Sequence, residues 1–553
     1  MAVLVWVNLN ILNAQNKETK NADKHFARLE YIAAIDAYLK LPETTKSQSY
    51  VQKKLAEAYR LTQNPVEAEK WYARLLEHKT SNEDYFWYAQ MLASNEKYDD
   101  SQKWFVKFAA AAPTDSRAIA FQENPDYLTH ILSQKPLFTV EKTTLSTGFS
   151  DFGAYINNGK VYFASTRNAS KQIYRWNNQP TTDLYYANIS NGAFTDIRPL
   201  EGAVNTKYNE GSVAISPEGL TMFFTRINYN KGNYGKDSAG ISNLNIFTAK
   251  RNGDVWENIT SLPFNNTEYS TGHPALSADG QTLYFSSNMP GGYGKTDLYK
   301  VAINPDGSYS NPENLGPDIN TPTDEMFPFS GADGTLYFSS NGHPGLGGLD
   351  IYYAQATANG FGRVANMGKP INSSKDDFAF YIDDSSQSGF LSSDRDAVSG
   401  NDDIYSFTTI PRFAESVSEA PVSASVQHEI QKPLSPKDAI LDLGSLRFEF
   451  NSSAITEENK YVLDKVIVEM KKNPAIVIQV NAYSDNVGTP EYNLRLSSKR
   501  AQSAVDYITA RGIAPYRISG KGYGSSSPKV DCISCTPEQN AMNRRLEFVV
   551  SKD

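Results

Sequence analysis

Cys532 and Cys535 are the two cysteines of the 553-residue chain, and they stand close together near its C-terminal end. A C-x-x-C pair can form a redox couple, half of a zinc site or a local disulfide. Zinc would need two further ligands, and the nearest histidine in the sequence is His428. A thioredoxin-like pair opens a helix after a strand, whereas this pair lies in the polar stretch VDCISCTPEQN. In an oxidising compartment we therefore predict a disulfide between Cys532 and Cys535 that closes a short loop.

Two other patterns could suggest chemistry but have simpler explanations. Gly294-Lys295-Thr296 looks like the end of a phosphate-binding loop, but Met289 occupies the position of the required earlier glycine, and a strand follows instead of a helix. The aspartates within 383–403 could bind calcium, yet they lack the spacing of a calcium loop, so turn formation explains them better. We therefore predict no nucleotide, no metal and no cofactor.

The charge and the N-terminal segment restrict where the protein acts. A formal net charge of −9 argues against nucleic acid as a partner, because such binding needs a basic face to displace phosphate counterions. Residues 1–14 belong to the apolar run MAVLVWVNLNILNAQ, which is typical of a secretory signal cleaved after Ala14; an apolar first helix of the mature protein is the alternative. No later segment approaches the ~20 apolar residues of a membrane-spanning helix. We predict a secreted protein.

Residues 18–136 have helical periodicity and contain an internal repeat. The segments AIDAYLKL (34–41), AEKWYARL (68–75) and SQKWFVKF (101–108) superpose at spacings of 34 and 33 residues. Ala56 and Ala89 mark the partner helices, where a small residue lets paired helices approach. Repeats of this length resemble tetratricopeptide repeats, so we expect about three of them and a closing helix near 115–133. Their aromatic residues are interpreted as core and not as a ligand site.

Residues 137–410 change to short strands separated by turns. Five similar segments recur, namely KVYFAST (160–166), LTMFFTR (220–226), TLYFSSN (282–288), TLYFSSN (335–341) and SGFLSSD (388–394). Four strands in about fifty residues resemble one blade of a WD-type β-propeller. The last repeat lacks its fourth strand, and FTVEKTTL (138–145) can supply it. Because this pairing removes an exposed sheet edge, we predict a five-bladed propeller closed by its own N-terminal strand.

A linker and a small α/β domain complete the chain. Residues 411–440 are rich in Pro, Ser and Ala without periodicity, which is linker composition. Residues 441–553 predict strands at 446–450, 475–483, 516–524 and 544–551 and helices at 456–472 and 490–511. Pro490 suits the first turn of a helix and Gly512 a C-terminal cap. We expect a sandwich with both helices on one face of the sheet.

Motifs of this last region resemble the OmpA family and follow the family's order. They are FEFNSSAI (448–455), AYSDNVG (482–488), YNLRLSSKRAQSAVDYI (492–508), ISGKGYG (518–524) and MNRRLEF (542–548). The family's glycine and histidine are replaced by Ala482 and Tyr483, which alters the shape of its pocket. The resulting fold class is multidomain: an α-helical tetratricopeptide solenoid, a five-bladed β-propeller and a C-terminal α/β OmpA-like sandwich.

The resemblance also implies a ligand and the residues that bind it. Members of the family bind the diaminopimelate of the peptidoglycan stem peptide without covalent chemistry, and their acid and arginine fall on Asp485 and Arg500. This ligand carries an ammonium and a carboxylate on one carbon, which a fixed acid and a planar guanidinium can match. The polar neighbours implied at the peptidoglycan-binding site are Asn451, Ser484, Asn493 and Arg544. An ordinary surface salt bridge between Asp485 and Arg500 is the alternative.

Together these patterns predict a non-catalytic adaptor in the periplasm, bound to peptidoglycan and associated with the outer membrane. The repeats and propeller would bind an outer-membrane or periplasmic protein partner. The domain order resembles periplasmic components of the type IX secretion or gliding machinery. A propeller-housed enzyme acting on glycan is one alternative, although no G-x-S-x-G motif or metal-ligand cluster supports it. A purely structural wall-binding protein whose propeller binds glycan is the other.

Overall fold

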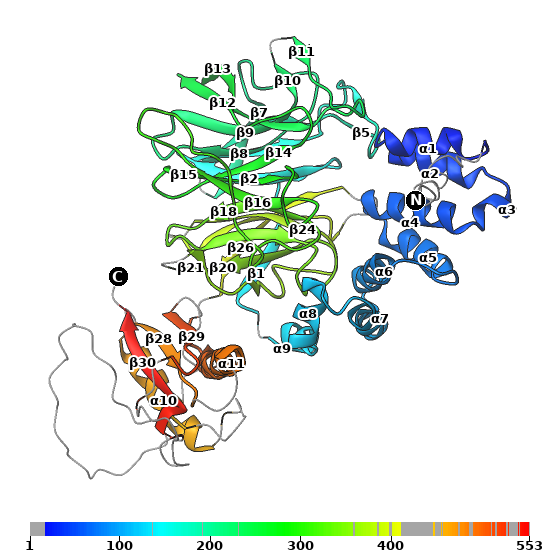
Figure 1. The fold of residues 1–553 in the computed structure, drawn as a ribbon. Helices are drawn as coiled ribbons and strands as arrows, with labels where there is room; N and C mark the ends of the chain where they lie inside the picture. The colour runs from blue at the N-terminus through cyan, green and yellow to red at the C-terminus, as the bar shows by residue number, and fades with distance from the viewer. Residues whose placement is uncertain are drawn as a thin grey trace, which may run out of the picture. The chain divides into compact units, whose positions relative to one another are not determined.

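The chain divides into two compact units, Met1–Glu415 and Ser416–Asp553 (Figure 1). The computed structural model describes residues 17–134, 136–190, 192–230, 232–357, 360–383, 386–396, 401–410, 446–447, 455, 457–473, 476–485, 490–509, 511–514, 517–526, 529, 540 and 542–551. Within these residues no helix has both the length and the apolar character that crossing a bilayer requires.

The first unit opens with helices that lie along one side of its sheets (Figure 1). They are α1 (Lys20–Ala27), α2 (Tyr31–Leu39), α3 (Glu43–Lys46), α4 (Ser49–Leu61), α5 (Pro65–Leu75), α6 (Asn82–Ser94), α7 (Tyr98–Ala111), α8 (Ser116–Glu123) and α9 (Tyr127–Ser133). Local sequence sets several starts. The Asn64 side chain accepts a hydrogen bond from the Glu67 amide ahead of Pro65, and Ser81 forms a capping box with Asp84.

A left-handed turn joins the two helices of each pair at the spacing of the sequence repeat. Leu29, Gln63 and Glu96 have φ of 59°, 55° and 61°, and they follow α1, α4 and α6. This conformation is uncommon for residues other than glycine. Its recurrence indicates that the three helix pairs turn in the same way.

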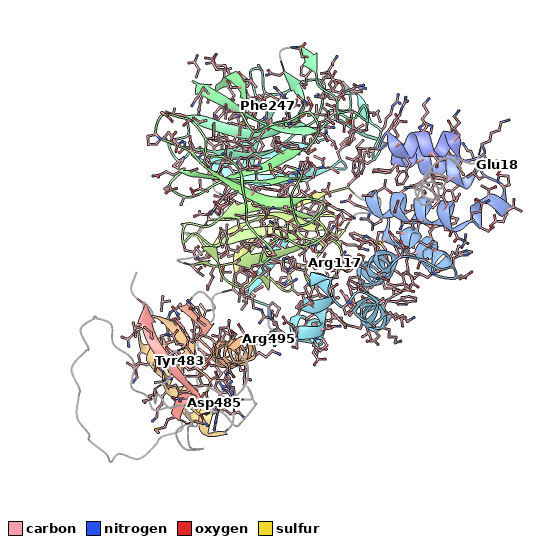
Figure 2. All side chains as sticks on the ribbon, in the orientation of Figure 1. Glu18, Arg117, Phe247, Tyr483, Asp485 and Arg495 are labelled. Carbon is pink, nitrogen blue, oxygen red and sulfur yellow. The ribbon has the colours of Figure 1, made fainter. Side chains whose placement is uncertain are left out.

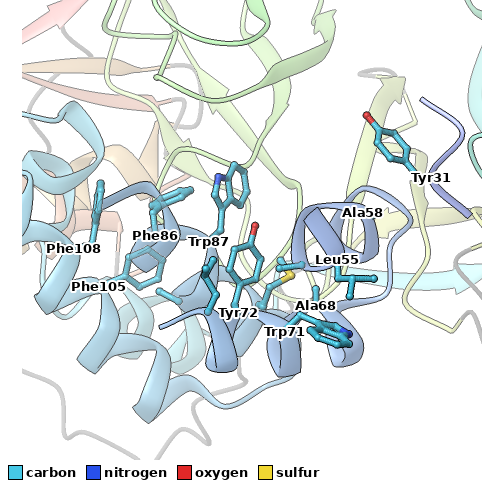
Figure 3. Packing of buried hydrophobic residues seen from close by; sticks show 14 of the residues in the cluster. Tyr31, Leu55, Ala58, Ala68, Trp71, Tyr72, Phe86, Trp87, Phe105 and Phe108 are labelled. Atoms are coloured by element: carbon cyan, nitrogen blue, oxygen red, sulfur yellow. The ribbon is translucent and has the colours of Figure 1, made fainter. Parts of the chain in front are cut away.

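Small and aromatic side chains pack between the helices as the repeat predicts (Figure 3). Ala34, Ala56 and Ala89 are fully buried, which lets neighbouring helices approach closely. Tyr38 and Tyr72 are also buried, so the prediction that the repeated aromatics form a core is confirmed for them.

The predicted closing helix near 115–133 is wrong in one respect, because two helices, α8 and α9, replace it. Pro125 lies in the break between them, and Asn124 has a non-helical conformation with φ −139° and ψ 67°. A proline disfavours the helical conformation of the residue before it and lacks an amide hydrogen, which accounts for the break.

The described residues between 136 and 410 form five four-stranded antiparallel sheets, in the orders β2-β3-β6-β7, β8-β9-β12-β13, β14-β15-β16-β17, β18-β19-β20-β23 and β24-β25-β26-β1. Their strands are β1 (Phe138–Lys142), β2 (Asp151–Asn157), β3 (Lys160–Ser165), β6 (Asp183–Ser190), β7 (Ala193–Pro199), β8 (Glu210–Ile215), β9 (Thr221–Ile227), β12 (Leu244–Asn252), β13 (Val255–Ser261), β14 (Thr271–Leu276), β15 (Thr282–Ser287), β16 (Asp297–Ala302), β17 (Glu313–Asn314), β18 (Glu325–Ser330), β19 (Leu336–Ser340), β20 (Asp350–Ala354), β23 (Ala365–Asn366), β24 (Asp377–Asp383), β25 (Ser388–Ser393) and β26 (Asp403–Thr409). Short hairpins are formed by β4 (Ile173–Tyr174) with β5 (Gln179–Pro180), β10 (Tyr229–Asn230) with β11 (Asn233–Tyr234), and β21 (Ala356–Thr357) with β22 (Gly360–Phe361).

The first strands of the five sheets contact one another in succession, from β2 through β8, β14, β18 and β24 and back to β2. Each carries an irregular register at the same place, where one residue adopts a positive φ. These residues are Gly153, Ser212, His273, Phe327 and Ala379. A bulge of this kind bends a strand and increases its twist. The repeat thus carries one bulge in each first strand.

The prediction that the strand before the first repeat completes the last repeat is confirmed. β1 pairs antiparallel with β26, from Phe138 opposite Thr409 to Lys142 opposite Tyr405. The ring of Phe138 also packs edge-on against Phe407, with centroids 5.5 Å apart. Segments far apart in the sequence therefore form one sheet.

The helices and the sheets of the first unit are joined by polar and aromatic contacts. The Trp176 indole donates to the Leu61 carbonyl at 2.8 Å, and its ring packs edge-on against Tyr31. The Gln63 amide donates to the carboxylates of Asp376 at 3.0 Å and Asp402 at 3.3 Å. The left-handed turn after α4 therefore rests on the sheets.

The second unit contains the predicted strands and helices. They are β27 (Leu446–Arg447), α10 (Glu457–Lys472), β28 (Val477–Ala482), α11 (Pro490–Thr509), β29 (Ile518–Gly522) and β30 (Arg545–Ser551). The sheet order is β27-β30-β28-β29, with β28 parallel to β29 and antiparallel to β30. The helix α11 packs on β28 and β29, and its buried Ala501, Ala504 and Ile508 join the core.

Deleting residues 137–145 should lower the melting temperature of the whole first unit by at least about 5 °C, because it exposes the edge of β26 and removes a packed aromatic ring. Thermal unfolding followed by circular dichroism measures this. Glu141→Ala is the matched control, since that side chain is exposed on β1. An unchanged melting temperature in the deletion would contradict the role of β1 in closing the last sheet.

Candidate functional site

Asp485 lies just beyond the end of β28, on a segment that backbone hydrogen bonds hold on two sides (Figure 2). The Tyr483 amide donates to the Arg545 carbonyl, and the Ser484 amide donates to the Gly524 carbonyl, both at 2.9 Å. Ser484 and Asp485 are both buried, with exposed fractions of 2% and 5%. The backbone therefore fixes the position of the carboxylate.

The helix α11 presents Asn493, Ser497 and Arg500 at intervals that place them on one helical face. All three are buried, and Arg500 has no exposed surface. The Nδ2 atom of Asn493 is buried and has no hydrogen-bond partner among the described residues. A buried donor of this kind is costly to leave unpaired, so it is available to a ligand.

Gly524 connects the strand end to the helix face. Its carbonyl accepts from the Ser484 amide, while its own amide donates to the Ser497 Oγ at 2.8 Å. Gly524 has φ +56°, and a Cβ there would approach the Leu494 amide nitrogen to 3.1 Å. A residue with a side chain would strain this turn, so glycine suits the link between the segment of Asp485 and the helix of Arg500.

Arg544 is the one predicted neighbour for which a direct ion pair with Asp485 is observed in the described residues. Its Nη1 lies 2.6 Å from Asp485 Oδ2, and both side chains are largely buried. The pair is a charge-assisted hydrogen bond, and removing either partner would leave a buried charge unpaired, which is costly. The ion pair also means that a ligand ammonium would share Asp485 with Arg544 or displace it.

Tyr483, predicted to replace a histidine of the family, is held by its own contacts. Its ring stacks on Tyr523 at 5.2 Å, and the Arg545 guanidinium lies 3.8 Å from its centroid. Arg545 in turn donates to Glu547 at 2.7 Å. Burial raises the pKa of the Tyr483 hydroxyl. This tyrosine therefore has a structural role beside the site.

Three predicted residues, Asn451, Cys532 and Cys535, lie outside the described residues. The disulfide stays a prediction. Within the part of the chain that the structure describes, no group of three or more His, Cys, Asp or Glu side chains is arranged to hold a metal ion. Sequence reasoning did not identify Ser497 or Gly524, although the spacing of Ser497 between Asn493 and Arg500 is a usable signal.

Residues 447–544 match the model of the OmpA family. The chain is 34% identical over 108 residues to the peptidoglycan-binding protein ArfA of Mycobacterium tuberculosis, a match covering 20% of this chain and 32% of ArfA. It is 38% identical over 86 residues to outer membrane protein A of Klebsiella aerogenes, covering 15% of this chain and 24% of that protein. The chain thus spans about a third or less of these relatives.

A solved structure is also similar, that of the peptidoglycan-associated lipoprotein from Burkholderia pseudomallei. It has 25% sequence identity and a TM-score of 0.19, and the match covers 19% of this chain and 89% of the lipoprotein. The family match and the sequence identities show that the C-terminal part of the chain is an OmpA-like domain.

Gly522→Ala should destabilise the OmpA-like domain by roughly 1–3 kcal/mol, because the added Cβ would meet the Ser498 amide nitrogen at 2.3 Å and push α11 away from β29. Denaturant unfolding of residues 436–553 by circular dichroism measures the change. The matched control is Gly520→Ala on the same strand, whose Cβ would meet Ala501 at 3.1 Å and should cost less. Equal losses of unfolding free energy in the two variants would show that a Cβ at Gly522 is no more crowded than one at Gly520.

Proposed function

We propose that the chain is a non-catalytic periplasmic adaptor, which binds peptidoglycan through diaminopimelate and anchors an outer-membrane complex to the cell wall. The observation that carries the proposal is the buried Asp485 and the buried Arg500 on two elements that Gly524 connects, within an OmpA-like domain. One relative of this domain, ArfA, is a peptidoglycan-binding protein.

The chemistry of the ligand fits these side chains. In the proposed complex the Asp485 carboxylate accepts hydrogen bonds from the diaminopimelate ammonium, and the Arg500 guanidinium holds the adjacent carboxylate through two parallel hydrogen bonds. The Nδ2 of Asn493, which has no hydrogen-bond partner among the described residues, is a further donor for that carboxylate. Arg544 neutralises Asp485 in the absence of ligand, which keeps a buried charge paired. Ser484 and Asn451 complete the proposed polar wall.

For the first unit we propose a tetratricopeptide solenoid that packs on a five-bladed β-propeller. The repeat spacing of the left-handed helix turns supports the solenoid. Five four-stranded sheets, first strands that contact in a circuit and the pairing of β1 with β26 support the propeller. The proposed domain limits are residues 18–136 and 137–410, with a linker at 411–440.

The proposed partner is a protein of the outer membrane or periplasm that binds the solenoid and propeller. The order of solenoid, propeller and OmpA-like domain is similar to that of PorE, a periplasmic protein of the type IX secretion apparatus. Cell-wall anchoring of such a machine, or of the gliding machinery, is the role that this order suggests. The proposed location is the periplasm, on the peptidoglycan side of the outer membrane.

Residues 436–553 should cosediment with sacculi that contain diaminopimelate, and Asp485→Ala or Arg500→Ala should abolish cosedimentation. Each substitution leaves one charge of the ligand unmatched, a cost of about 2–5 kcal/mol. Asp464→Ala is the matched control, because Asp464 is an exposed acid on α10 of the same domain. Sacculi whose stem peptides carry lysine should be bound more weakly. Wild-type cosedimentation by both site variants would refute the assignment.

Crosslinking of intact cells, read by mass spectrometry, should join residues 17–410 to an envelope protein and residues 441–553 to peptidoglycan peptides. This result is expected because the proposal assigns the protein partner to the first compact unit and peptidoglycan to the second. Crosslinks from the first unit only to peptidoglycan would instead favour a purely structural wall-binding protein.

A further inference from the structure

In several sheets the first strand begins with an acidic residue, and a threonine four residues earlier donates a hydrogen bond to that residue's carboxylate. Asp151 on β2 accepts from both the amide and the hydroxyl of Thr147, four residues earlier. Glu325 on β18 also accepts from the amide and the hydroxyl of Thr321, one on each of its two oxygens. Glu210 on β8 accepts from the Thr206 hydroxyl at 2.6 Å. At least one oxygen of each acid is therefore bonded to its own loop.

Both carboxylate oxygens of Asp151 and of Glu325 have partners, whereas one oxygen of Glu210 has none among the described residues. Asp151 pairs with Arg167 at 2.6 Å, and Glu325 accepts from Ser340 at 2.7 Å. Arg226 follows Glu210 at the spacing that separates Arg167 from Asp151.

Arg226 nevertheless makes other contacts. Its Nη1 donates to the Ala203 carbonyl at 3.4 Å, and its guanidinium lies 4.2 Å from the centroid of Phe247. Glu210 Oε2 consequently has no hydrogen-bond partner among the described residues, although Glu210 is only 1% exposed. A buried carboxyl oxygen without a partner is costly, and it points to a ligand that supplies one.

Glu210 lines a cavity of about 260 Å³ at the first strands of the sheets. Ser212 on β8 and His273 on β14 line the same cavity, and their Oγ and Nδ1 atoms are also buried without partners in the described structure. Phe152 and Phe327 add aromatic walls. No lysine or arginine is present among the described residues that line the cavity, whereas a second acid, Asp402, is.

We propose that this cavity binds a primary alkylammonium group. The three N–H bonds of such a group equal in number the three acceptors, on Glu210, Ser212 and His273, that line the cavity and lack partners in the described structure. The aromatic walls suit a short aliphatic chain and attract a cation over their faces. The group can belong to a free amine or to a lysine side chain, since both present the same chemistry.

The pKa of Glu210, which depends on its burial and on the charges around it, makes ligand binding sensitive to pH. Burial raises the pKa of Glu210 to about 8, while the Thr206 hydrogen bonds and the Lys171 charge lower it and Asp183 raises it. Lys171 is itself paired with Asp183 at 2.8 Å, and Arg226 is the other cation close to Glu210. An ammonium beside Glu210 favours the ionised carboxylate, so binding at pH 7 should release a proton and should tighten as the pH rises toward 8.

Calorimetric titration of the full chain with cadaverine tests the proposal. The titration uses the Asp485→Ala background, so that ammonium binding at the OmpA-like domain does not contribute. We expect saturable binding of cadaverine, none of n-pentanol, and proton release in buffers of different ionisation enthalpy. Nα-acetyl-lysine methylamide is titrated in parallel, and the tighter of the two amines identifies whether the source is a free amine or a lysine side chain.

Glu210→Gln should weaken cadaverine binding at least about tenfold, because it removes the charge while keeping the shape. Glu325→Gln is the matched control, since the Glu325 oxygens are already bonded within its own repeat, and it should bind within about twofold of the parent. Absence of binding by both amines, or equal binding by the two variants, would overturn the proposal. Failure of the unsubstituted residues 436–553 to cosediment with sacculi, with cadaverine binding by the full chain retained, would refute only the proposed function of the OmpA-like domain.

Discussion

The pairing of β1 with β26 is the interaction on which the first unit depends. It completes the last sheet with a strand that precedes the first sheet, so the two ends of the sheet region meet at Phe138 and Thr409. Without it, the backbone donors and acceptors of β26 would face solvent as an open edge. The first strands β2, β8, β14 and β18 contribute residues to the lining of the cavity that contains Glu210. Asp402, which directly precedes β26, lines the same cavity.

The helices depend on the same framework. The turn that contains Gln63 rests on Asp376 and Asp402, and the hairpin of β4 and β5 reaches α4 through Trp176. These contacts lie at the end of the helix pairs that carries the left-handed turns. The face of the helices that lies against the sheets is therefore occupied by the chain's own residues, and a partner protein would use the remaining surface.

Much of the fold followed from the sequence because repetition reveals element length and pairing. The TLYFSSN segments predicted the second strands, and counting strands per repeat predicted the role of β1. Periodicity alone was not sufficient, because it predicts one continuous helix where Pro125 separates two. The site was only partly predictable. Asp485 and Arg500 lie in recognisable motifs, but the link through Gly524 and Ser497 joins residues far apart in sequence. Arg226 keeps the spacing of Arg167, yet its described hydrogen bond is to the Ala203 carbonyl, and one oxygen of Glu210 has no partner among the described residues. Packing, which the spacing does not reveal, decides this difference.

Recognition of diaminopimelate by Asp485 and Arg500 together is tested most directly by a crystal structure of residues 436–553 with a diaminopimelate-containing stem peptide. We expect the ligand ammonium within hydrogen-bond distance of the Asp485 carboxylate and the adjacent ligand carboxylate on the Arg500 guanidinium. A peptide bound away from both residues, with the ion pair between Asp485 and Arg544 unchanged, would contradict this mode of recognition.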